Sequence, residues 1–174
     1  NSGTAMRLLV GLLSGQKFDT VLIGDDSLSG RPMNRVVNPV QQMGARVDTT
    51  DAGTAPLTIH GNQLLTAIRY ELPVASAQVK SCVLLAGLYA SGNTEVIEPA
   101  PTRDHTERML RGFDCQVITD GNVIRMQGGQ QLRATNIEVP ADISSAAFFM
   151  VAGSIAPDSE ITLSHVGINP TRSG

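Results

Sequence analysis

The chain has 174 residues, 41% of them hydrophobic, and a formal net charge of −3 at pH 7. This acidic balance and an aromatic content of 3% argue against nucleic-acid binding, which needs a basic surface and, for single strands, stacking rings. No apolar run is long enough to span a membrane and no secretory leader pattern is visible, so we expect a cytoplasmic protein without a membrane partner. The length allows one sizeable core, or one domain plus part of another.

The first segment contains two predicted helices and four predicted strands. A helix-spaced apolar run from Thr4 to Leu13 predicts the first helix. Arg31-Pro32 then introduces a second helix, from Met33 to Met43. The strands predicted here are Thr20–Ile23, the stretch after Gly44 that includes Arg46-Val47, Leu57–His60 and Ile68–Tyr70.

The same order of elements follows a second time. The predicted helices are Ser76–Tyr89 and Asp104–Arg111. The predicted strands are Thr94–Ile97, the strand into which the stretch Phe113–Val117 turns, Val123–Met126 and Asn136–Val139. A third copy begins with a helix at Ser144–Ile155 and a strand at Glu160–Leu163.

The copies recur about 70 residues apart. The interval separates the helix starts at Thr4, Ser76 and Ser144, and also the arginines Arg31, Arg103 and Arg172. Each unit reads helix, strand, helix, strand, strand, strand, which predicts an α/β architecture of repeated units. Because the first and last copies are incomplete, we expect a piece of something longer.

Two of the predicted helix starts have the pattern of anion sites. Gly3 precedes the first helix, where free amides and the helix dipole favour a negative ligand and glycine allows close approach. Ser76, the Ala77 amide and the Gln78 side chain could hold a phosphate or a sugar hydroxyl at the second. The alternative is that both are plain N-caps, with Gln78 in solvent.

Two arginines lie just before predicted helices. A helix N-terminus disfavours a cation, so Arg31 and Arg103 are better explained by a bound anion than by helix stability. The alternative is an ion pair with Asp25, Asp26 or Asp104. Their equivalent positions in the repeat favour anion binding.

The histidines do not predict a metal site. His105 belongs to the run Asp104–Glu107, which is typical of a helix cap. His60 and His165 lie in strand-like segments without a second ligand nearby, so we expect no metal. The two cysteines have no metal-type spacing and are expected to be reduced, at least partly buried thiols.

Six segments of the chain carry a resemblance to a known family: Asn1–Arg7, Gly24–Leu28, Arg31–Met33, Ser76–Ser81, Thr102–Glu107 and Pro140–Ala146. Together they resemble the 5-enolpyruvylshikimate-3-phosphate (EPSP) synthase family, over essentially all 174 residues. Ala77 and the run Thr102–Glu107 are similar to the branch called class II.

The resemblance implies an enolpyruvyl transferase fold, an inside-out α/β barrel of six βαβαββ units in two domains. The helices of each domain would point their N-termini into the cleft between the domains. Residues 1–139 would form most of one domain without its start. Residues 140–174 would form the crossing and the beginning of a unit of the second domain.

The resemblance also implies an activity, the transfer of the enolpyruvyl group of phosphoenolpyruvate to the 5-hydroxyl of shikimate 3-phosphate with release of phosphate. This step belongs to chorismate and aromatic amino acid biosynthesis. It implies no metal or organic cofactor, and a monomer when complete. Shikimate 3-phosphate would be bound by Ser76, Ala77, Gln78 and Arg103, and phosphoenolpyruvate by Gly3, Arg31 and Gln78.

The family's acid and base residues have no counterpart among these residues, so we expect the chain alone to be inactive. Glyphosate occupies the phosphoenolpyruvate site in this family, and Gly3 implies a sensitive site because tolerant members often carry alanine there. One alternative is a UDP-N-acetylglucosamine enolpyruvyl transferase of the same fold, although its usual loop cysteine is missing from Ser27–Gly30. Another alternative is a non-catalytic anion-binding domain.

Overall fold

The computed structural model describes residues 2–173, and of residues 172 and 173 only the backbone. Arg172 is the predicted third equivalent of Arg31 and Arg103, and its side chain therefore lies outside the described residues. The chain divides into two compact units, Asn1–Arg133 and Ala134–Gly174. The domain boundary that the family resemblance implies, between residues 139 and 140, stays a prediction.

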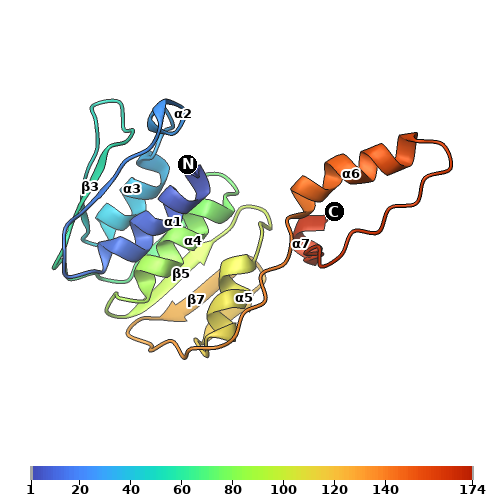
Figure 1. Cartoon of the computed structure of the whole chain (residues 1–174). Coiled ribbons are helices and arrows are strands. Elements are labelled where there is room, and N and C mark those ends of the chain that lie inside the picture. Colours follow the sequence, from blue (N-terminus) through green and yellow to red (C-terminus); the bar gives the residue numbers. More distant parts are fainter. Residues whose placement is uncertain (1, 174) are drawn as a thin grey trace. The chain divides into compact units, whose positions relative to one another are not determined.

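The first unit contains five helices and two small sheets among its described residues (Figure 1). Its helices are α1 (Gly3–Ser14), α2 (Asp26–Ser29), α3 (Asn34–Gln42), α4 (Ala77–Gly87) and α5 (His105–Gly112). One sheet has the strand order β1-β3-β2 and is antiparallel, with β1 at Thr20–Leu22, β2 at Arg46–Asp48 and β3 at Leu57–His60. The other has the order β4-β5-β7-β6, with β4 at Arg69–Glu71, β5 at Asn93–Ile97, β6 at Val117–Asp120 and β7 at Val123–Gln127.

Strand β4 joins the two repeats. It is the last strand of the first copy in sequence, yet it pairs in parallel with β5 of the second copy, with Tyr70 opposite Val96. The remaining pairs of that sheet are antiparallel. Consecutive units therefore share a sheet, as repeat architectures do when neighbouring units complete each other.

The ends of α3 and α5 confirm that the copies are structurally equivalent. Gly44 follows α3 with φ 99° and Asp114 follows α5 with φ 65°, both in the left-handed region that ends many helices. In each copy the amide of the next residue donates a hydrogen bond to a carbonyl of the helix. Ala45 donates to Val40 at 3.0 Å, and Cys115 donates to Leu110 at 2.9 Å.

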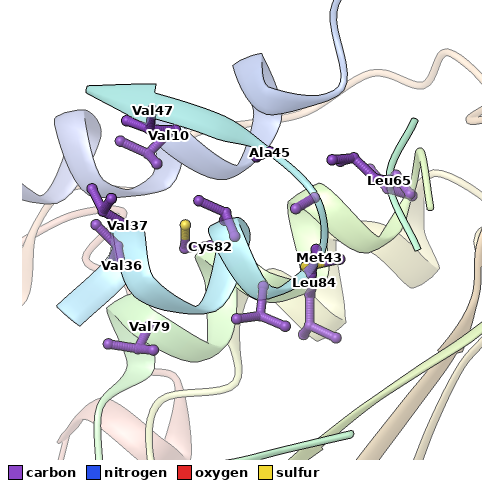
Figure 2. Packing of buried hydrophobic residues seen from close by; sticks show 14 of the residues in the cluster. Val10, Val36, Val37, Met43, Ala45, Val47, Leu65, Val79, Cys82 and Leu84 are labelled. Atoms are coloured by element: carbon purple, nitrogen blue, oxygen red, sulfur yellow. The ribbon is translucent and has the colours of Figure 1, made fainter. Parts of the chain in front are cut away.

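Helix α4 is the centre of the hydrophobic core. Eight of its eleven residues are buried, which explains why its sequence is apolar on nearly every face. Side chains from α1, α3 and α4 pack together with Val47 of β2 and with Leu65, which lies after β3 (Figure 2). Among the fully buried or nearly buried members are Val10, Val36, Val37, Met43, Val47, Cys82 and Leu84.

The second unit, within residues 134–173, contains α6 (Ile143–Ile155) and the short α7 (Pro170–Ser173). Asp142 caps α6, accepting a hydrogen bond from the Ser144 amide at 3.2 Å. The predicted strands at 136–139 and 160–163 were wrong. A strand requires a hydrogen-bonded neighbour, and the described part of this unit offers only a single bridge, between Ala141 and Val166.

Most other predicted elements of the first unit are confirmed to within a few residues. The stretch 113–117, predicted to turn into a strand, does so at Val117, because residues up to Cys115 still complete the end of α5. Helix α2 was not predicted, since four residues are too few for an apolar period to show.

None of the helices described in residues 2–173 has the length and apolar character that crossing a membrane requires.

Candidate functional site

Gly3 and Arg31 lie against each other at the start of α1. Gly3 is the first residue of the helix and is buried. A Cβ atom placed on it would be 2.8 Å from Nη1 of Arg31. A guanidinium therefore lies at the first residue of α1, and its charge and the helix start both favour a negative ligand.

The ion-pair alternative for the two predicted arginines is not supported. Among the ion pairs of the described residues, none involves Arg31 or Arg103. Asp25 instead accepts the Leu28 amide at 2.8 Å and caps α2. Asp104 accepts a hydrogen bond from Nε of Arg108 at 2.7 Å.

The starts of α1 and α4 are joined through Gln78. Its Nε2 donates to the Thr4 hydroxyl at 2.8 Å, and its Oε1 accepts from Nη1 of Arg7 at 2.7 Å. Ser76 is the N-cap of α4 and accepts the Val79 amide at 3.4 Å, as predicted. The alternative in which Gln78 extends into solvent was wrong, because both ends of its amide are bonded.

Arg7 is a site residue that the sequence interpretation missed. Its Nη2 donates to the Pro32 carbonyl at 3.3 Å, so it links α1 to the Arg31 loop as well as to Gln78. Its buried Nε has no hydrogen-bond partner among the described residues. Burial, and then the charges of Arg35 and Arg31, lower the pKa of the Arg7 guanidinium. One signal was present, since Arg7 is four residues after Gly3 and so on the same helix face.

Helices α1 and α4 run parallel with their starts at the same end (Figure 1). The contacts advance together along both helices: Thr4 bonds to Gln78, and Gly11 lies against Cys82. The positive ends of two helix dipoles are therefore adjacent to each other and to a group of arginines. Such an arrangement is suited to small, multiply charged anions.

Arg103 lies on the exposed loop before α5. The start of α5 is held to α4 by a hydrogen bond between the Thr106 and Ser81 hydroxyls at 2.6 Å. Among the described residues, Arg103 has no hydrogen bond to Ser76, Ala77 or Gln78. Direct contacts thus connect Gly3 with Arg31 and α1 with Gln78, whereas Arg103 is linked to α4 through other residues at the two ends of its loop.

Two of the histidines each lie beside one carboxylate, His60 beside Asp48 and His165 beside Glu138. His60 pairs with Asp48, with 2.6 Å between Nε2 and Oδ2, and this hydrogen bond lowers the pKa of the Asp48 carboxyl. Across residues 2–173, no group of three or more His, Cys, Asp or Glu side chains is arranged to hold a metal ion. Asp104 occupies the N-cap position of α5, as expected, although its side chain makes no hydrogen bond to the helix amides.

The whole chain, residues 1–174, matches the family described as EPSP synthase (3-phosphoshikimate 1-carboxyvinyltransferase). Relatives named 3-phosphoshikimate 1-carboxyvinyltransferase from Methylococcus capsulatus and Halorhodospira halophila are 66% and 64% identical over all of the chain. The chain spans 40% and 39% of their lengths.

A solved structure described as EPSP synthase from Acinetobacter baumannii has a TM-score of 0.89 and 60% sequence identity. It covers 99% of this chain, which in turn covers 40% of that structure. This similarity confirms the expected α/β enolpyruvyl transferase fold, of which the chain holds a part. With a match along its full length and relatives above 60% identity, the chain belongs to the EPSP synthase family.

Proposed function

We propose that the protein of which these residues are part transfers the enolpyruvyl group of phosphoenolpyruvate to the 5-hydroxyl of shikimate 3-phosphate, releasing phosphate. The observation that carries the proposal is the junction of Gly3, Arg31 and Gln78 at two adjacent helix starts. Both substrates are anions, and this junction combines helix amides with a guanidinium.

In the proposed arrangement Gly3 and Arg31 bind phosphoenolpyruvate. The glycine exposes the amides at the start of α1, and the guanidinium can hold a carboxylate or a phosphate through two parallel hydrogen bonds. Ser76, the Ala77 amide and Arg103 bind shikimate 3-phosphate at the start of α4. Gln78 contacts both substrates, which its fixed position between Thr4 and Arg7 supports.

The chemistry requires a proton at the methylene carbon of phosphoenolpyruvate, addition of the hydroxyl to the adjacent carbon, and elimination of phosphate. The residues described here contribute orientation and positive potential, which hold two mutually repelling substrates in contact. We assign them no proton-transfer role. Because the chain spans about 40% of its relatives, we propose that the acid and base groups are supplied elsewhere and that these 174 residues alone do not turn over.

Glyphosate is the proposed inhibitor of the phosphoenolpyruvate site. A methyl group at Gly3 would intrude on Arg31, and the longer inhibitor has less room to adjust than the substrate.

The relatives quoted above are named for shikimate chemistry, so neither the UDP-N-acetylglucosamine reaction nor a non-catalytic role gains support. A cytoplasmic monomer remains our expectation for the complete protein.

The test is phosphate release from shikimate 3-phosphate and phosphoenolpyruvate by a full-length protein containing these residues, with and without glyphosate. Release that requires both substrates and falls with glyphosate is the expected result. Release that does not depend on shikimate 3-phosphate, or no release at all by the folded protein, would contradict the proposed function.

A further inference from the structure

A buried ion cluster, formed by Lys80, Glu98 and Glu107, lies beside the proposed site without belonging to it. Nζ of Lys80 is 3.1 Å from Oε2 of Glu98 and 2.7 Å from Oε1 of Glu107. The exposed fractions of the three residues are 1%, 6% and 2%. Charges are rarely buried to this extent unless they are paired.

The cluster connects the two elements assigned to shikimate 3-phosphate. Lys80 lies one turn into α4, and its amide donates to the carbonyl of Ser76, the N-cap, at 3.1 Å. Glu98 immediately precedes the loop Pro99–Asp104, which carries Arg103, and Glu107 lies in the first turn of α5 immediately after it. One ammonium group therefore holds both ends of the Arg103 loop against the start of α4.

A further hydrogen bond reaches inside the loop. The Thr102 hydroxyl, one residue before Arg103, donates to Oε1 of Glu98. The backbone of Glu98 is itself fixed by Asn122, whose carbonyl accepts the Glu98 amide at 2.9 Å and whose side chain donates to the Glu98 carbonyl at 3.1 Å. The loop that carries Arg103 is thus linked to Lys80 by a chain of contacts.

Stability alone does not account for such a cluster. Removing charges from water costs free energy, and apolar side chains of similar volume often stabilise a protein as well as a buried ion pair does. Here two carboxylates share one ammonium group, and Oε2 of Glu107 is buried without a hydrogen-bond partner among the described residues. What the cluster provides beyond apolar packing is a defined geometry between α4 and the loop.

We propose that Lys80, Glu98 and Glu107, with Thr102, are positioning residues that set the distance between Arg103 and the Ser76–Gln78 helix start for binding of shikimate 3-phosphate. The inference rests on the proposed function. It predicts that weakening the cluster impairs the use of shikimate 3-phosphate selectively, because Gly3 and Arg31 are held by other contacts.

The direct test replaces Thr102 in the full-length protein. Thr102→Val removes the hydroxyl while keeping the shape of the side chain, and Thr102→Ser keeps the hydroxyl. We expect Thr102→Val to raise the KM for shikimate 3-phosphate about tenfold, the order of effect that follows from misplacing a binding group. The KM for phosphoenolpyruvate should stay unchanged, and Thr102→Ser should behave as the parent does.

Two control variants make the comparison specific. Thr119→Val removes a hydroxyl on β6 that accepts Nη2 of Arg111 at 2.7 Å, and it should alter neither KM. Lys80→Met should raise the KM for shikimate 3-phosphate, as Thr102→Val does. Arg125→Gln should not, although it breaks a half-buried ion pair between β7 and Glu95 of β5. If Lys80→Met fails to fold, the Thr102 pair still decides the question.

The possible outcomes separate the inference from the proposed function. If the parent turns over but Thr102→Val raises both KM values equally, or raises neither, the inference alone is overturned. A lower unfolding temperature with both KM values unchanged would show a purely structural role and overturn it as well. No turnover by the folded parent would overturn the proposed function, and this inference with it.

Discussion

Gly11 of α1 lies directly against the main-chain carbonyl of Cys82 in α4. A side chain at Gly11 would occupy the space of that carbonyl, so the two helix backbones approach as closely as they do only because the residue is glycine. The close approach continues at the helix end, where Gly15 lies against the ring of Tyr89. These contacts keep α1 and α4 aligned, and with them the two helix starts that form the proposed site.

Gly11→Ala should therefore destabilise the protein by about 1–3 kcal/mol, the usual cost of adding atoms to a close-packed core. Urea unfolding of the parent and the variant measures the change. Gly112→Ala is the matched control, because a Cβ at Gly112 meets no atom within 4 Å. Equal free energies of unfolding for the parent and Gly11→Ala would show that the helices can separate without cost.

Arg31→Lys should raise the KM for phosphoenolpyruvate by about tenfold or more, because lysine cannot form the paired hydrogen bonds of a guanidinium. The KM for shikimate 3-phosphate should change little. Steady-state kinetics with each substrate varied in turn provides the measurement, and Arg46→Lys on β2 serves as a surface control. A larger effect on shikimate 3-phosphate would mean that the two substrates are assigned to the wrong helix starts.

Gly3→Ala should raise the inhibition constant of glyphosate more than the KM for phosphoenolpyruvate. The new methyl group would lie 2.8 Å from Nη1 of Arg31, so the guanidinium has to shift and substrate binding also weakens somewhat. The end of a flexible side chain can make this adjustment, whereas the longer inhibitor loses space as well. Inhibition assays at several phosphoenolpyruvate concentrations give both constants, and equal losses would contradict the steric explanation.

Cys82 should resist alkylation in the folded protein. Burial raises the pKa of its thiol from 9.0 to about 12, and the reactive thiolate is therefore scarce at pH 9. Iodoacetamide labelling followed by peptide mass spectrometry should modify Cys82 only after denaturation. Rapid labelling under native conditions would show that the α1–α4 contact opens readily.

The same shift affects stability at high pH. Because the folded-state pKa lies above that of the unfolded chain, the contribution of Cys82 is complete below about pH 9 and declines as the pH rises toward 12. The loss approaches about 1.4 kcal/mol for each pH unit within that interval. Unfolding measured across it should be less pH-dependent in Cys82→Ala than in the parent.

Much of the fold could be predicted because the sequence repeats itself. Equivalent helix starts and equivalent arginines indicated an α/β repeat, and the left-handed residues Gly44 and Asp114 end matching helices. The strands predicted at 136–139 and 160–163 failed for a general reason. Alternating side chains describe a possible strand, but only a neighbouring strand makes it one, and local sequence does not show that neighbour.

The candidate site was predictable in its parts and less so in its connections. Local patterns pointed to anion binding at Gly3 and Arg31, whereas Gln78 was assigned to the site only through the family resemblance. The contacts that join these residues span long stretches of chain. Arg7 and Lys80 were missed because each depends on partners distant in sequence. Lys80 did carry a signal, since it is the one charged residue of the otherwise uncharged helix α4.

The parallel alignment of α1 and α4 has a thermodynamic consequence. The positive N-terminal ends of α1 and α4 repel each other and the nearby arginines. This repulsion destabilises the ligand-free fold, and a bound anion removes it. Substrates should therefore act as folding ligands, adding about 2.7 kcal/mol when present at a hundred times their dissociation constant. The abundance of such a protein in a cell would then follow its substrate supply, through the fraction of chains that stay folded.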